Sequence, residues 1–344
     1  MFSHVHSRHL FASALFCLNG LEYCFARIQM PNDPKKHFGD RLTAAIVSKK
    51  TPLVVGLDPR INQLPDNLTS SSEASSAEKQ AEITAQFCCE LIDVVAGLVP
   101  AVKPQAAFFE RLGWHGMVVL SRVVDYATQR GLLVIMDAKR GDIGSTAEAY
   151  ASAYLGAKPQ STWGCDCLTV NPYMGHDTLE PFVEVANQTG SGIFVLVKTS
   201  NPGSGAIQEQ SVQSSLGDDQ KVYQIVANKV QELSADSAGQ SGYGNIGAVV
   251  GATYPEQLAQ LRESMPNTIF LIPGFGAQGG SAADVAGGLD ANGLGGVINS
   301  SRGIIFAYQR PEYANATNWQ TAVEQATHDA IAKIADQTSA SRLR

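Results

Sequence analysis

At the point that decides its fold, the chain reads Gly131-Leu-Leu-Val-Ile-Met-Asp-Ala-Lys-Arg-Gly-Asp-Ile-Gly-Ser-Thr146. The apolar run over 131–136 begins at a glycine and ends in charged residues, which is typical of a buried strand in a parallel sheet. Asp137, Lys139 and Asp142 therefore stand where this strand leaves the core and its loop begins. In an α/β barrel the chemistry takes place at this end of the strands, so this segment is the first candidate site.

Apolar runs of the same kind recur along the chain and alternate with stretches of helical periodicity. Such alternation predicts βαβ units and a parallel sheet. Eight runs over roughly 250 residues match a closed (β/α)8 TIM barrel, which is the α/β fold class that we predict. The runs are Leu53–Leu57, Ala101–Val102 with its neighbours, Leu132–Met136, Cys167–Val170, Gly192–Val197, Ile246–Val250, Thr268–Ile272 and Gly296–Ile298.

The segments between these runs include several with helical spacing of their apolar residues. A last helix over 319–334 is expected to close the ring. Two connections, 59–77 and 201–218, are long and rich in small polar residues. We predict a solvated insertion for the first and a lid over the catalytic end for the second. The other helical stretches are Phe38–Val47, Glu78–Val95, Met117–Thr128 and Lys221–Leu233.

Residues 30–344 are predicted to form one TIM-barrel domain, preceded by an N-terminal tail over 1–29. The tail has an apolar stretch after three histidines, but it lacks the charged start and longer apolar core of a signal peptide. Met30-Pro-Asn-Asp-Pro reads like a natural start. We therefore expect the tail to be disordered or to reflect a start codon assigned too far upstream, and we give it no function.

The composition argues against three classes of protein: nucleic-acid-binding, membrane-spanning and zinc-binding proteins. A formal net charge of −7 and a pI of about 5.5 argue against a nucleic-acid-binding protein, which would show a basic face. No stretch is apolar enough to span a membrane. The six cysteines form no CxxC pair with zinc-binding spacing, and we predict no metal site. Reduced thiols fit a cytoplasmic protein, which is the location that we expect.

Charged residues also follow the first two strands. Asp58 ends the first strand, and Lys103 ends the second between apolar neighbours. With Asp137 and Lys139 on the third, carboxylates and lysines alternate on strands that meet at one mouth of the barrel. Strand-end charges can merely solvate a barrel rim, but this alternation pairs each lysine and keeps it protonated in a site that excludes water. The pattern therefore favours a functional site.

Glycine-rich turns follow the last two strands, at the usual phosphate site of such barrels. The seventh strand leads into Pro273-Gly-Phe-Gly-Ala-Gln-Gly-Gly280 and the eighth into Asn299-Ser-Ser-Arg-Gly303. Glycine lets backbone N–H groups approach phosphate oxygens, and Arg302 can add two parallel charged hydrogen bonds. The glycines also match a dinucleotide fingerprint, but that motif needs an acidic residue after the next strand, where Arg302 stands. The pattern therefore favours a monophosphate.

The run Asp137-Ala-Lys-Arg-Gly-Asp142 resembles the Asp-x-Lys-x-x-Asp signature of the orotidine 5′-phosphate decarboxylase family, and its continuation to Ala151 is similar to the longer bacterial type. The other motifs follow in the family's order over most of residues 38–335. The resemblance implies a lyase that converts orotidine 5′-phosphate to uridine 5′-monophosphate, the last step of de novo synthesis of that nucleotide. It also implies a homodimer that uses no organic cofactor and no metal.

The resemblance assigns roles to the matching catalytic positions. Lys139 would protonate C6 of the pyrimidine as carbon dioxide leaves, and Asp137 would lie against the departing carboxylate. Asp142 would reach the neighbouring subunit's site across the dimer interface, together with Ile143 and Thr146. The catalytic residues implied in this way are Lys103, Asp137, Lys139 and Asp142.

Further positions would bind the substrate. Asp58 and Lys103 would hold the ribose hydroxyls, and Ser200, which precedes Asn-Pro-Gly, would read the pyrimidine ring. The phosphate would be held by the side chains of Gln278 and Arg302 and by loops that contain Gly276, Gly279 and Gly303.

Two alternatives remain open. A metal-dependent sugar-phosphate decarboxylase or aldolase of the same barrel superfamily would share Asp-x-Lys-x-x-Asp and the phosphate loops. It would need an acidic magnesium ligand near the end of the second strand, where Lys103 stands. A non-catalytic nucleotide-binding protein would keep the phosphate loops, but it would have no need of Lys139.

Overall fold

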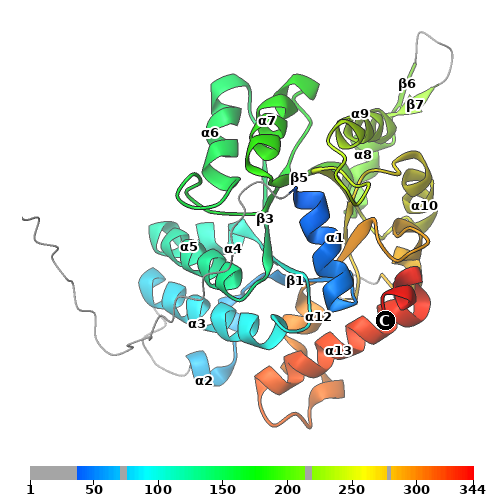
Figure 1. The fold of residues 1–344 in the computed structure, drawn as a ribbon. Coiled ribbons are helices and arrows are strands. Elements are labelled where there is room, and N and C mark those ends of the chain that lie inside the picture. The colour runs from blue at the N-terminus through cyan, green and yellow to red at the C-terminus, as the bar shows by residue number, and fades with distance from the viewer. Residues whose placement is uncertain (1–36, 70–75, 214–218, 277–279) are drawn as a thin grey trace, which may run out of the picture. The chain divides into compact units, whose positions relative to one another are not determined.

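Eight parallel strands form the centre of the structure (Figure 1). They are β1 (Leu53–Leu57), β2 (Ala101–Pro104), β3 (Leu133–Arg140), β4 (Cys167–Val170), β5 (Gly192–Lys198), β8 (Ile246–Val250), β9 (Phe270–Pro273) and β10 (Gly296–Ser300). They close into a barrel in the order β1-β10-β9-β8-β5-β4-β3-β2. All eight predicted strands and the TIM-barrel fold class are confirmed. The strands are buried on both faces over most of their length, which is why the sequence shows continuous apolar runs.

The computed structural model describes residues 37–69, 76–213, 219–276 and 280–344. These residues belong to one unit, Asp33–Arg344, and the predicted tail 1–29 lies outside them. Within the described ranges, no helix is long and apolar enough to cross a membrane.

Helices surround the barrel, and the predicted ones are all present (Figure 1). The longer helices are α1 (Phe38–Lys49), α3 (Ala77–Val95), α5 (Gly113–Gln129), α6 (Gly144–Tyr154), α7 (Glu180–Thr189), α9 (Val222–Asp236), α10 (Pro255–Ser264) and α13 (Trp319–Gln337). The short ones are α2 (Asp66–Thr69), α4 (Ala106–Glu110), α8 (Gly205–Gln208), α11 (Ala282–Val285) and α12 (Arg302–Ile305).

The barrel interior is filled with apolar side chains at its amino-terminal end. α1 covers this end: Phe38 meets Phe194 edge to face, with ring centroids 6.1 Å apart, and lies against Gly192 at the start of β5. Each strand contributes to the same cluster, through Val54, Ala101, Ile135, Cys167, Phe194, Val249, Leu271 and Val297.

A polar layer follows directly above this apolar layer. Because side chains alternate along a strand, the next inward position towards the carboxyl end is two residues further on. On β2, β3 and β4 these positions hold Lys103, Asp137 and Thr169, and all three are buried. The strand period therefore brings a lysine, a carboxylate and a hydroxyl together at the mouth.

The described residues of the two long connections contain regular structure. In the described part of the first, Asn62, Asp66 and Asn67 are exposed, but Leu64 is only 5% exposed and belongs to the hydrophobic core, so the prediction of a solvated insertion is wrong for Leu64. The second contains α8 and a short antiparallel pair, β6 (Ser211–Val212) with β7 (Gln220–Lys221), which the sequence did not predict. Its function as a lid stays a prediction.

Candidate active site

The end of β3 is a bulge that sets the direction of Lys139. Met136 pairs with Leu168, but the next pair joins Arg140 to Val170, so β3 advances four residues while β4 advances two. Within the bulge Lys139 has a φ of 48°, a left-handed conformation that is uncommon for a residue with a side chain. The regular strand alternation stops here, and the Lys139 side chain returns towards Asp137.

Asp137 lies between two lysines. Its Oδ2 accepts a hydrogen bond from Lys103 Nζ at 2.6 Å, and its Oδ1 accepts one from Lys139 Nζ at 2.5 Å. Gln105 Nε2 also donates to Oδ2 at 3.1 Å, and Thr169 Oγ1 donates to Oδ1 at 3.1 Å. Each carboxylate oxygen therefore has one ammonium and one neutral donor, which fixes the carboxylate in position.

Burial and charge act in opposite directions on this cluster. Burial alone would lower the pKa of Lys103, but the carboxylates of Asp137 and Asp58 outweigh it and raise that pKa above its usual value. Burial would raise the pKa of Asp137, but Lys103 and Lys139 hold it well below its usual range. Both groups are thus ionised at neutral pH. Lys103 is 4% exposed, whereas the Lys139 side chain is 46% exposed in the single chain, so the water exclusion predicted for both lysines holds only for Lys103 here.

The substitution Asp137→Asn should destabilise the fold by about 3–5 kcal/mol near neutral pH, because it leaves Lys103 buried without its main counter-ion. The depressed pKa of Asp137 stabilises the fold above its unfolded value of about 4, and this contribution is lost as the pH falls through the folded value. The raised pKa of Lys103 stabilises the fold below about pH 10 and is lost as the pH rises through the folded value.

Urea unfolding of the wild type and Asp137→Asn as a function of pH measures this effect. The difference in unfolding free energy should be flat around neutral pH and shrink at both extremes. A difference that grows on acidification to about pH 2 would contradict the assignment.

Among the residues that the structure describes, two neighbouring strands each carry, at or just after their carboxyl ends, a buried oxygen with no hydrogen-bond partner. These oxygens are Asp58 Oδ1, directly after β1, and Asn299 Oδ1 on the neighbouring strand β10. A buried acceptor without a donor is costly, and hydroxyl groups of a ligand would satisfy both. Asp58 was predicted from its place at the end of a strand, whereas Asn299 was not, although Asn299 lies two residues after the inward-facing Val297.

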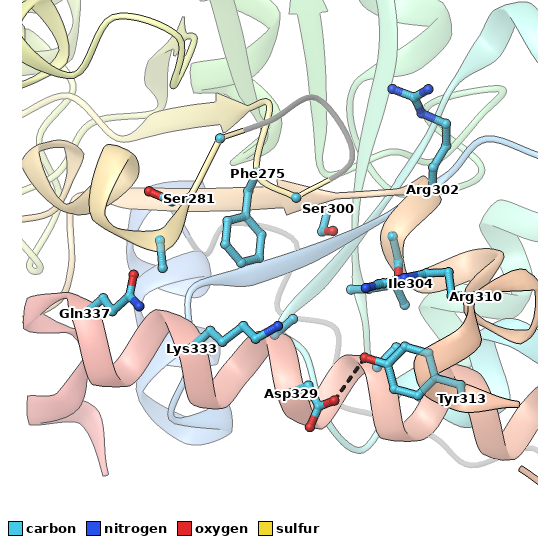
Figure 2. A pocket seen from close by; sticks show the side chains of 16 residues that line it. Phe275, Ser281, Ser300, Arg302, Ile304, Arg310, Tyr313, Asp329, Lys333 and Gln337 are labelled. Atoms are coloured by element: carbon cyan, nitrogen blue, oxygen red, sulfur yellow. Dashed lines mark hydrogen bonds between the residues drawn. The ribbon is translucent and has the colours of Figure 1, made fainter. Parts of the chain in front are cut away.

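The phosphate loops meet at Ser300. A Cβ atom built on Gly276 would lie 3.8 Å from Ser300 Oγ, and one built on Gly303 would lie 3.7 Å from the same atom. The two predicted phosphate loops therefore lie side by side. Gly276 has a φ of 81°, which a side chain would disfavour. Arg302 begins α12 and lines the same cavity as Arg310 and Lys333, although Figure 2 shows its side chain pointing away from theirs. Gln278 and Gly279 lie outside the described residues.

The remaining predicted residues lie at the same rim. Ser200 follows β5 and packs against Gly251, which follows β8.

The carboxylate of Asp142 accepts a hydrogen bond from the backbone N–H of the next residue, Ile143, at 2.8 Å. Within the described residues no ion pair joins Asp142 to Lys103 or Lys139. The single chain therefore brings together three members of the predicted tetrad and not the fourth. Ile143 is 62% exposed, and Thr146 is exposed as well.

Comparison with known proteins gives one consistent result. Residues 51–317 match the Orotidine 5′-phosphate decarboxylase / HUMPS family. Orotidine 5′-phosphate decarboxylase from Rhodopirellula baltica is 57% identical over 84% of this chain and 96% of its own length. The protein of the same name from Caldicellulosiruptor bescii is 41% identical over 79% of this chain and 90% of its own length. The solved structure of Leishmania donovani OMP decarboxylase superimposes with a TM-score of 0.65 and 33% identity, covering 88% of this chain and 98% of that one.

Proposed function

The chain belongs to the orotidine 5′-phosphate decarboxylase family and is a carboxy-lyase, and from this premise we propose how its own residues carry out the reaction. The substrate's pyrimidine lies over Asp137 and Lys139, and its phosphate is held by the loops around Ser300. Asp58 and Lys103 bind the ribose hydroxyls, and Ser200 contacts the ring. The observation that carries the proposal is the carboxylate of Asp137 held by two lysine ammonium groups at the barrel mouth.

The chemical step breaks the bond between C6 and the carboxylate carbon. Carbon dioxide leaves, the electron pair stays on C6, and Lys139 Nζ donates a proton to that carbon. The now neutral amine regains a proton from water. The electron pair has little delocalisation in the ring, so stabilisation must come from charges that are in place before the step. The four hydrogen-bond donors around the Asp137 carboxylate provide such a fixed arrangement. Because of them, the carboxylate and the two lysines are already in position before the step.

Binding energy from the phosphate helps to lower the barrier. Enzymes lower activation barriers by about 8–23 kcal/mol, and a carbanion without an electron sink should require the upper part of that range. Binding energy from parts of the substrate that do not react can be used to press the carboxylate against Asp137. The loops at Gly276 and Gly303 are suited to this role because both lie against Ser300, and Arg302 stands directly before Gly303.

We further infer a homodimer in which Asp142 completes the neighbouring subunit's site. The segments 141–143 and 171–174 are neighbours, since a Cβ at Gly141 would lie 2.8 Å from Asn171 O and 3.6 Å from Met174 Cε. They expose the large apolar side chains of Ile143, Tyr173 (79%) and Met174 (48%) beside Asp142. An exposed apolar patch next to the carboxylate of Asp142 supports a subunit interface at this rim.

The same premise supports a place in pyrimidine biosynthesis and a cytoplasmic location. Cys88, Cys165 and Cys167 are buried free thiols, which suits a reducing compartment. Because the composition is acidic, we propose no nucleic-acid partner, and we propose no membrane partner either.

Conversion of orotidine 5′-phosphate should survive excess chelator, because no step of the proposed reaction uses a metal. The loss of substrate absorbance by purified protein, with and without chelator, measures this. Lys103 occupies the strand end where the metal-dependent alternative needs an acidic ligand, and the described residues contain no group of three or more potential metal ligands. Activity lost on chelation and restored by Mg²⁺ would favour that alternative. Nucleotide binding without conversion would favour the non-catalytic one.

A further inference from the structure

We propose that Thr169 is a positioning residue that holds both Asp137 and the backbone of Lys139 in their reactive arrangement. The inference rests on the proposed function and deepens it. Thr169 lies on β4, is 1% exposed and faces the barrel interior. Its hydroxyl accepts hydrogen bonds from the backbone N–H groups of Ala138 at 3.1 Å and Lys139 at 2.9 Å, and donates one to Asp137 Oδ1 at 3.1 Å.

These three contacts use the full capacity of a hydroxyl group, which has one donor and two acceptor positions. The hydrogen atom must therefore point at Asp137, because both lone pairs are engaged by the bulge. A single oxygen thus fixes the carboxylate and the backbone of the lysine relative to each other. Neither the lysine's left-handed conformation nor the direction of the carboxylate has to be selected when substrate binds.

The bulge explains why this hydroxyl is needed. The ladder between β3 and β4 is interrupted after Met136 and resumes where Asn171 N donates to Arg140 O at 2.7 Å. Ala138 and Lys139 lie in the interruption, so their N–H groups have no carbonyl partner on β4. A buried N–H without a partner is unfavourable, and the Thr169 hydroxyl accepts from both. Removing it would release the loop that carries the proton donor.

The test compares Thr169→Val, which keeps the size but removes the hydroxyl, with Thr169→Ser, which retains it. Thr169→Val should lower kcat by about 10²-fold, as expected for misplacing a reacting group by about 1 Å, with KM changed much less because the phosphate loops are untouched. Thr169→Ser should restore kcat to within a few-fold of the wild type. If Thr169→Val does not fold, Thr169→Ala is assayed instead, because it removes the same hydroxyl and leaves room for water to solvate the two amides.

Thr327→Val is the matched control. Thr327 is also fully buried, but its hydroxyl donates to Val323 O at 2.7 Å within α13 and not to the Asp137 cluster. This variant should lose stability while keeping kcat. A kcat for Thr169→Val within about threefold of the wild type, or a serine variant as slow as the valine variant, would overturn the proposal.

Amide hydrogen exchange at Ala138 and Lys139, followed by NMR, separates this inference from the proposed function. Exchange should be slow in the wild type and Thr169→Ser and at least tenfold faster in Thr169→Val, whatever the substrate. If the wild type does not convert orotidine 5′-phosphate, the proposed function fails while exchange still reports whether Thr169 holds the bulge. Unchanged exchange in Thr169→Val would overturn the positioning role even in an active enzyme.

Discussion

A mixture of Asp142→Asn and Lys103→Ala subunits should regain about a quarter of the wild-type activity, although each variant is inactive by itself. In a mixed dimer one site combines the intact Lys103 of the first subunit with the intact Asp142 of the second. The other site lacks both groups. Random association makes about half of the dimers mixed, and one site in each is complete.

The measurement is the rate of uridine 5′-monophosphate formation after subunits have exchanged, with exchange itself followed by native mass spectrometry. A mixture of Lys103→Ala and Lys139→Ala is the matched control, since both residues belong to the same chain's site and no complete site can form. Absence of recovery in the first mixture despite exchange, or equal recovery in the control, would show that Asp142 does not act across the interface.

Most of the fold could be predicted because its signals are local in the sequence. Each barrel strand is a short apolar run, and helix α13 shows its periodicity within its own residues. Leu64 was missed because one apolar residue among polar ones gives no period. β6 and β7 have two residues each and are too short to leave a pattern.

The candidate site was predicted less completely because part of it depends on contacts between strands. The positions of Lys103 and Asp137 follow from strand ends and alternation. The same alternation places Thr169, two residues after Cys167, at an inward position. A threonine is common in strands, however, so it could be identified as a site residue only once the bulge in the neighbouring strand β3 was known. The left-handed conformation of Lys139 could not be predicted, because glycine rather than lysine signals such a turn.

Lys139→Ala should reduce the rate of decarboxylation by about 10⁴-fold or more, because it removes both the proton donor and a charge beside the developing carbanion. Uridine 5′-monophosphate should still bind, since the phosphate loops and Asp58 are unchanged. The fold should also persist. The Lys139 side chain is 46% exposed, and Lys103 remains to pair with Asp137.

Lys229→Ala is the matched control, because Lys229 forms an ion pair with Glu232 at 3.1 Å on α9, away from the barrel mouth. It should leave the rate unchanged. The decisive measurement is the single-turnover rate of uridine 5′-monophosphate formation by Lys139→Ala at saturating enzyme, alongside the wild type. We predict a ratio of about 10⁴ or more with comparable nucleotide affinity. A folded Lys139→Ala enzyme within about tenfold of the wild-type rate would contradict the account.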